Sequence, residues 1–334
     1  MLVLGACGGD DAPAVVDSTP TTAAPAETSA DTTPATTTVA PGTVTVIVGA
    51  REPLSQAFDL EVASNGDLYI ANTNAAQLLR WDGTSMHVAY PGDFGEGENE
   101  FTGVATQSDG SVVFTTGLAE KWLKPNKELT DIRIDDTGDQ VLGLLLATGP
   151  QDEIYLIFGR TGAVDLLGAD GTLTHYAGNG ATTTKPVVIG DGGPALNAQF
   201  SRISDVVVDA DGVMYLADEG QGVIRRVKPD GTIDTVIGLG PIRYLDAPEG
   251  TAASDIKLGP GPLGVTVDDA GNLFVSVRAA GRVLRIDHLT GAVTRVAPET
   301  TFQSPTRLTF DNNGNLLLLI EDGKQVVSIA GVAS

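Results

Sequence analysis

The sequence predicts an all-β fold built from a repeated unit of four short antiparallel strands. Its clearest example is residues 203–238, where apolar runs alternate with turn signals such as Asp211-Gly212 and Asp230-Gly231, which are typical of hairpins. Similar segments recur along the chain, and a single four-stranded unit has two apolar faces that only neighbouring copies can bury. These observations predict a β-propeller, in which such units form blades around a central channel.

The repeated segments predict six blades. Residues 57–89 and 262–297 align with 203–238, and weaker copies begin at Phe101, Val141 and Pro305. In 203–238 the expected strands are 203–209, 213–217, 223–227 and 233–237. The turn between the first two strands carries a glycine in every copy: Gly66, Gly110, Gly149, Gly212, Gly271 and Gly314.

The last copy stops before its fourth strand, and a matching segment occurs near the other end of the chain. Residues 42–49, GTVTVIVG, resemble the fourth strand of the reference copy, GTIDTVIG. We therefore expect an N-terminal strand to complete the C-terminal blade, which closes the ring and pairs strand edges that would otherwise be exposed. The alternative is an unrelated strand that leads into the first blade. The propeller is predicted to span 42–334.

The segment GDGGPALNAQF at 190–200, followed by the reference copy, resembles the loop-plus-blade signature of the NHL-repeat family, and EGTAASDIKL at 249–258 is a degenerate echo of it. The resemblance covers 42–334 and implies a six-bladed propeller used mainly for binding, without naming a ligand. The copies at Phe101 and Val141 match poorly. The Asn-His pair usual after the second strand is absent, so binding residues tied to it do not transfer; Asp218 and Glu219 stand there as candidates instead.

The N-terminal residues 1–7, MLVLGAC, have the form of a bacterial lipoprotein processing site, and Cys7 is the only cysteine. Because only six uncharged residues precede Cys7, we expect the true start of the signal sequence to lie upstream. Cys7 is then lipidated, and the alternative is a free thiol in a tail. The Thr-, Ala- and Pro-rich residues 8–41 predict a disordered linker. Together they predict an extracytoplasmic, cell-envelope lipoprotein whose membrane contact is the lipid anchor alone.

The net charge of −23 limits the partners. The segment 1–41 holds five acidic residues and no base, which leaves −18 on residues 42–334. Such a surface repels nucleic acid and anionic headgroups, since both need clustered Lys and Arg. A protein, a basic peptide, a neutral glycan or a cation remains as a partner, or the charge provides solubility alone.

The predicted channel mouth holds three charged residues at a position that is glycine in the other three copies. Asp59, Asp205 and Arg307 are equivalent there to Gly103, Gly143 and Gly264. We expect Asp59 and Asp205 to face one another across the axis with Arg307 beside Asp59. An Arg307 to Asp59 ion pair explains them, and the alternative is a bound polar ligand or cation, with Asp59 and Asp205 as weak metal ligands and calcium as the only cofactor considered.

Two long insertions, 178–201 and 238–260, separate a fourth strand from the next first strand. Long loops on a rigid scaffold often carry binding residues, so we expect the ligand face to bear both insertions and the channel mouth. Asp191 is a further ligand-binding candidate, or an acceptor within its turn.

These features predict a binding or scaffold module without catalytic residues. His87, His175 and His288 are expected in outer strands or turns far from the axis, which disfavours histidine ligation or base catalysis in the channel. The alternative is a divalent-metal hydrolase of the lactonase type that uses the channel mouth. A structural envelope protein is the third possibility.

Overall fold

The computed structural model describes residues 39–50, 54–91, 101–116, 119–124, 128–132, 144–158, 162–168, 171–181, 188–259 and 261–333. They belong to one compact unit, Val39–Ser334. Cys7, the signal-sequence remnant 1–7 and residues 8–38 of the predicted linker lie outside the described residues.

Antiparallel four-stranded sheets, called blades below, make up most of the described structure. Blade one comprises β2 (Ala57–Val62), β3 (Leu68–Asn72), β4 (Gln77–Trp81) and β5 (Met86–Tyr90). Blade two comprises β6 (Val104–Thr106), β7 (Val112–Thr116), β8 (Ala119–Leu123) and β9 (Leu129–Ile132). Blade three comprises β10 (Leu144–Thr148), β11 (Ile154–Phe158), β12 (Ala163–Leu167) and β13 (Leu173–Ala177).

The rest of the chain continues the pattern. Blade four comprises β14 (Ile203–Val208), β15 (Met214–Asp218), β16 (Val223–Val227) and β17 (Ile233–Ile237), so its strands were predicted to within one residue. Blade five contains β21 (Pro262–Val267), β22 (Leu273–Val277), β23 (Arg282–Ile286) and β24 (Ala292–Val296). Blade six contains β25 (Leu308–Phe310), β26 (Leu316–Ile320) and β27 (Gln325–Ile329). Where the structure describes the chain, four short 3₁₀ turns lie between strands: Thr73–Ala75, Ala195–Asn197, Ala253–Asp255 and Arg278–Ala280.

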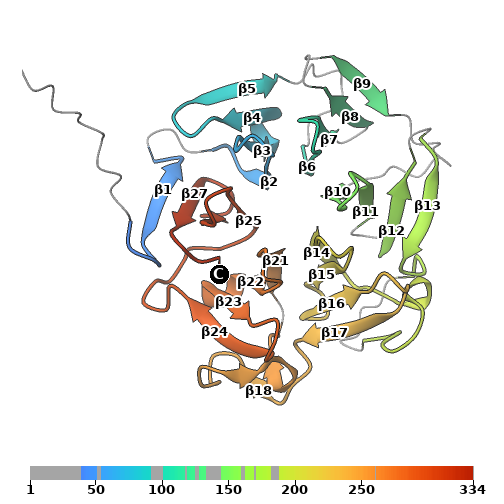
Figure 1. Cartoon of the computed structure of the whole chain (residues 1–334), viewed down its shortest axis with the longest axis vertical. Helices are drawn as coiled ribbons and strands as arrows, with labels where there is room; N and C mark the ends of the chain where they lie inside the picture. The colour runs from blue at the N-terminus through green and yellow to red at the C-terminus, as the bar shows by residue number, and fades with distance from the viewer. Residues whose placement is uncertain are drawn as a thin grey trace, which may run out of the picture. The chain divides into compact units, whose positions relative to one another are not determined.

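The first strands of the blades lie innermost and contact one another in a closed order, as Figure 1 shows. That order is β2, β6, β10, β14, β21, β25 and then β2 again. Because every blade buries its two apolar faces against its neighbours, the arrangement is that of a β-propeller.

The N-terminal strand completes the last blade, as predicted. β1 (Val44–Val48) pairs antiparallel with β27, with Val44 opposite Ile329 and Val46 opposite Val327. The amide of Gly42 also donates to the carbonyl of Ala330 at 2.7 Å. Figure 1 shows β1 beside β27, so the two ends of the propeller are joined by a strand pair.

The prediction of six four-stranded blades is wrong in one respect. Among the described residues five sheets have four strands, whereas β21–β24 belong to a five-stranded sheet. The additional strand is β19 (Thr251–Ala252), which comes from the preceding insertion and pairs with the outer edge of β24. The same insertion also forms a short parallel pair, β18 (Ile242–Arg243) with β20 (Ile256–Lys257).

Both insertions cover the edge of the blade that follows them. Before blade four, the amide of Gly192 donates to the carbonyl of Ile233 at 2.8 Å, and Pro194 bridges Thr232. Before blade five, the amide of Gly250 donates to Val293 at 2.8 Å. Covering an outer strand removes an exposed sheet edge, which stabilises the monomeric fold against edge-to-edge pairing.

An acid–arginine pair holds each insertion. Asp191 accepts from Nη2 of Arg225 at 2.7 Å, and Glu249 accepts from Nη1 of Arg295 at 2.7 Å. Arg225 lies on β16, where it is fully buried and its guanidinium stands 5.5 Å from the ring of Phe200. Arg295 lies on the fourth strand of its blade, so the two blades place the arginine on different strands.

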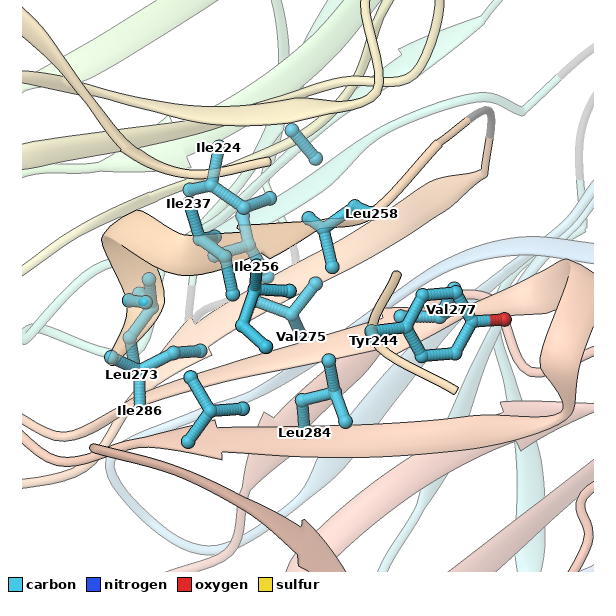
Figure 2. Packing of buried hydrophobic residues seen from close by; sticks show 14 of the residues in the cluster. Ile224, Ile237, Tyr244, Ile256, Leu258, Leu273, Val275, Val277, Leu284 and Ile286 are labelled. Carbon is cyan, nitrogen blue, oxygen red and sulfur yellow. The ribbon is translucent and has the colours of Figure 1, made fainter. Parts of the chain in front are cut away.

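The largest apolar cluster joins blades four and five and includes part of the second insertion. Figure 2 shows Ile224 and Ile237 of blade four packed near Val275 and Leu284 of blade five, with Ile256 between them. Leu258 and Tyr244 of the insertion extend the same cluster. The insertion therefore contributes to the core between two blades.

Candidate functional site: the central cavity

The three charged residues predicted at the channel mouth come together on the innermost strands. Asp59 and Asp205 follow a shift of strand register at the start of β2 and β14, and Arg307 directly precedes β25. All three are buried, with Arg307 only 5% exposed.

Arg307 lies between the two aspartates and contacts both. Its Nη1 stands 2.8 Å from Oδ1 of Asp205, and its Nε stands 3.6 Å from Oδ1 of Asp59. Nε also donates to the carbonyl of Phe58 at 3.2 Å, and Nη1 donates to the carbonyl of Ser204. The ion pair expected between Arg307 and Asp59 is therefore the longer of two, and Asp205 is the closer partner.

The aspartates also connect neighbouring blades. Asp59 Oδ2 accepts from the amide of Val104 in blade two at 3.0 Å, and Asp205 Oδ2 accepts from the amide of Val265 in blade five at 2.8 Å. Each carboxylate thus links its own blade to the first strand of the next blade. At the equivalent Gly264 a side chain does not fit, because a Cβ there would lie 2.1 Å from the carbonyl oxygen of Thr306.

Burial raises the pKa of both aspartates despite the nearby arginine. The pKa of Asp59 rises to about 7 because burial disfavours its charge; the Arg307 guanidinium opposes this effect, and Asp205 adds to it. Burial also raises the pKa of Asp205, again against Arg307. One guanidinium therefore does not fully offset the cost of burying two carboxylates.

A cavity of about 410 Å³ begins at these three residues. It follows β14 from Asp205 and β21 from Val265, and continues along the turns after these strands to Asp211 and Gly271, so it reaches the turns that join first to second strands. The insertions lie at the other ends of the first strands. The described parts of the insertions pack along outer blade edges and not beside this cavity, and the expectation that the ligand face bears both insertions stays a prediction.

Glu61 lies on the inner wall of the cavity and was not among the residues predicted from the sequence to form a site. It comes two residues after Asp59 on β2, and its half-buried carboxylate makes no hydrogen bond or ion pair with the described residues. Burial, Asp59 and Asp205 together raise the pKa of Glu61 to about 8. The sequence did carry a signal, because the residues five before the first-turn glycine in the five other copies are uncharged: Ala105, Leu144, Val207, Thr266 and Thr309.

The outer part of the cavity is acidic, and several of its acids have structural roles. Asp209 accepts from the amides of Asp211 and Val213, and Asp268 accepts from those of Ala270 and Asn272. These bonds fix the turns between first and second strands. Asp211 and Asp269 are exposed beside them.

His288 lies in the turn between β23 and β24, as expected, and that turn folds over the first-to-second-strand turn at Gly271. There His288 lines the outer part of the cavity, which was not predicted from the sequence. His87 and His175 are on the outer strands β5 and β13, as expected, where they contact Asp82 and Asp165.

The remaining predicted ligand residues lie away from the cavity. Asp218 is fully buried, and its carboxylate accepts from the amides of Ser201 and Gln221 at 2.9 and 3.0 Å. Glu219 pairs with Arg202, and Asp191 pairs with Arg225. These contacts give all three acids a role in holding loops.

Within the described ranges, no group of three or more His, Cys, Asp or Glu side chains has an arrangement that could hold a metal ion. In the same part of the chain, no helix has the length and apolar character needed to cross a membrane.

Comparison with known proteins supports the fold. No family model and no curated protein matches the chain, so the NHL resemblance stays a prediction. Among solved structures, a luciferin-regenerating enzyme has a TM-score of 0.62 at 13% identity over 88% of this chain and 96% of that chain. A streptogramin B lyase has a TM-score of 0.56 at 13% identity, covering 86% of this chain and 96% of that chain.

A third similar structure is an auxiliary nutrient binding protein from Bacteroides thetaiotaomicron VPI-5482. Its TM-score is 0.59 at 12% identity over 83% of this chain and 69% of that chain. These identities show a shared β-propeller fold and nothing finer. The fold is compatible with binding and with catalysis.

Proposed function

We propose that this protein is a binding module of the NHL-repeat type that takes a small ligand, or a side chain of a protein partner, into its central cavity. The observation that carries the proposal is the hollow end of the channel. At one end Arg307, Asp59 and Asp205 fill the axis, and beyond them the cavity of about 410 Å³ reaches the first-to-second-strand turns. This volume falls in the range of small-molecule sites, roughly 300–1,000 Å³.

A rigid wall favours binding over a structural role alone. Asp59 and Asp205 stand on paired strands of blades one and four, Arg307 directly precedes β25 of blade six, and each aspartate is fixed by one amide of the next blade. Polar groups that are held in place recognise a ligand without the entropic cost of ordering them.

Divalent-metal hydrolysis of the lactonase type is the alternative. The two facing carboxyl groups of Asp59 and Asp205 at the inner wall are the observation in its favour, although together with Glu61 they do not form a group that could hold a metal ion among the described residues. A metal ion between the aspartates would have to displace the Arg307 guanidinium, which contacts both of them. Elemental analysis after dialysis separates the two functions, since a stoichiometric metal supports the hydrolase.

We further propose that the propeller is an extracytoplasmic module tethered to the cell envelope through a lipid on Cys7. The composition of residues 1–41 supports this placement. Metabolic labelling with a fatty-acid analogue should mark the protein, and Cys7→Ser should abolish the label. Label that persists in Cys7→Ser would contradict the anchor.

The binding function is tested by filling the cavity. A library of amines, sugars, carboxylic acids and short peptides is screened by thermal shift and by native mass spectrometry. Val207→Trp fills the cavity from β14, and Ala270→Trp narrows it from an exposed turn. Ala279→Trp, at an exposed residue of the turn Arg278–Ala280, is the matched control.

We expect compounds that bind the wild type to lose affinity at least tenfold in Val207→Trp or Ala270→Trp and to keep it in Ala279→Trp. Circular dichroism confirms that each variant is folded. Ligands that bind all four proteins equally would overturn the proposal.

A further inference from the structure

We infer that the central cavity selects ligands that carry an organic cation, such as a primary ammonium or a guanidinium group, and that Glu61 is the residue that contacts it. This inference rests on the proposed binding function and names its ligand class.

The first argument concerns which of the charged side chains at the inner wall already have a hydrogen-bond or ion-pair partner. Asp59 and Asp205 share Arg307, and their remaining oxygens accept from backbone amides. Glu61 lines the same space and has no hydrogen bond or ion pair with a described residue. Among the described residues that line the inner cavity, Glu61 is thus the one whose carboxyl oxygens are available to a ligand.

The second argument is the cost of this arrangement. A half-buried carboxylate without a partner is unfavourable, because burial removes water that no protein donor replaces. Asp59 and Asp205 add repulsion, and the raised pKa of Glu61 reflects both effects. A bound cation would provide hydrogen-bond donors and positive charge at the same point, and so would relieve both.

The third argument is the electrostatic field along the cavity, from its outer wall to Glu61. Arg307 is the only Lys or Arg among the described residues that line the cavity, and both aspartates already contact it. The outer wall adds four more acids, Asp209, Asp211, Asp268 and Asp269, and His288 is the only basic side chain among the described residues of that wall. A cavity lined by one sign of charge concentrates ligands of the opposite sign and excludes anions.

The experiment measures the binding of matched ligands to matched proteins. The probes are putrescine, agmatine, phenethylamine and lysine amide, each at up to 10 mM, beside the neutral 2-phenylethanol and the anionic phenylacetate. The proteins are the wild type, Glu61→Gln, and Glu299→Gln as a control at an exposed glutamate after β24. Titration calorimetry at pH 8.5 and low salt gives the affinities.

We expect at least one cationic probe to bind the wild type and Glu299→Gln, and to lose about tenfold or more in Glu61→Gln. Neutral and anionic probes should bind at least tenfold more weakly than their cationic counterpart. If no cationic probe shows binding that depends on Glu61, the inference is wrong.

Two outcomes separate this inference from the binding function. If 2-phenylethanol or phenylacetate binds, is blocked by Val207→Trp and is unaffected by Glu61→Gln, the cavity is a ligand site but not a cation site. If calcium binds in place of the amines and Glu61→Gln removes it, the selectivity is for a metal ion, which also overturns the inference. If neither Val207→Trp nor Glu61→Gln weakens the binding of any probe, the proposed function itself is overturned.

Discussion

The network at Arg307 makes a quantitative prediction about stability. Arg307→Met keeps most of the side-chain volume and removes the only cation between Asp59 and Asp205. Removing one partner of a buried charged pair costs about 3–5 kcal/mol, because the other charge remains buried without compensation. For a domain of this size that cost corresponds to a fall in melting temperature of about 5–10 °C.

The cost should depend on pH, and its sign follows from the pKa shifts. Arg307 lowers the pKa of both aspartates against burial, so its removal raises both values further. At pH 5.5 the aspartates of the variant can be neutral, and the loss should be small. At pH 8.5 they must either ionise without a partner or take up protons from a basic solution, so the loss should approach its full size.

Thermal and urea unfolding at the two pH values measure this effect. Adding Asp205→Asn to Arg307→Met should recover at least half of the loss at pH 8.5, since the asparagine can still accept from the amide of Val265. Arg278→Met is the matched control: its pair with Asp322 is half exposed and should contribute under about 1 kcal/mol. An equal loss at both pH values, or no rescue by Asp205→Asn, would refute the electrostatic reasoning.

Three further predictions concern the closure, Glu61 and the first insertion. Deleting 42–50 removes β1 and exposes the edge of β27, so we expect aggregation or a large fall in melting temperature. Deleting 8–38 should leave the melting temperature unchanged, and equal behaviour of the two truncated proteins would contradict the role of β1. Burial raises the pKa of Glu61 from 4.5 to about 8 in the folded protein, so folding binds a proton in this window and stability falls as pH rises through it. Asp59 and Asp205, whose pKa values are also raised, add to this slope; Glu61→Gln should therefore make it shallower and stabilise the protein at pH 9 by up to about 5 kcal/mol, and an unchanged slope would refute the assignment. Arg225 is fully buried, and its Nε and Nη1 have no partner among the described residues. Asp191→Ala leaves the buried guanidinium without its ion pair, so this variant should lose about 1–3 kcal/mol more of its free energy of unfolding in urea than Arg225→Met. A larger loss in Arg225→Met would contradict this prediction.

The sequence by itself determined the features that depend on local structure. The strands of blade four were predicted because apolar runs and turns are short-range signals: Gly212 has a positive φ of 78°, and Asp209 accepts from two amides of its own turn. The partnership of β1 with β27 was also predictable, because the repeat leaves one strand missing at one end and one unassigned at the other. The prediction of four strands in every blade was wrong for blade five, because β19 arises from a loop whose sequence has no strand pattern of its own.

The sequence also identified Asp59, Asp205 and Arg307, because each replaces a glycine of the repeat. It could not decide which pair forms: Arg307 is nearer to Asp205, a choice set by the reach of its side chain across the ring and by carbonyl groups such as that of Ser204. Nor could it assign Asp218 or Asp191 to internal contacts, because their partners are defined by how loops fold back on blade four.

The cavity and its open end were decided only by the tertiary structure. Glu61 and His288 are separated by more than two hundred residues, and they line one space because β2 and the turn after β23 belong to blades that meet around the same axis. A repeat pattern gives the order of such blades. Which side chains fill the axis, and where it stays hollow, depends on the volumes of residues from all blades together, and no single repeat contains that information.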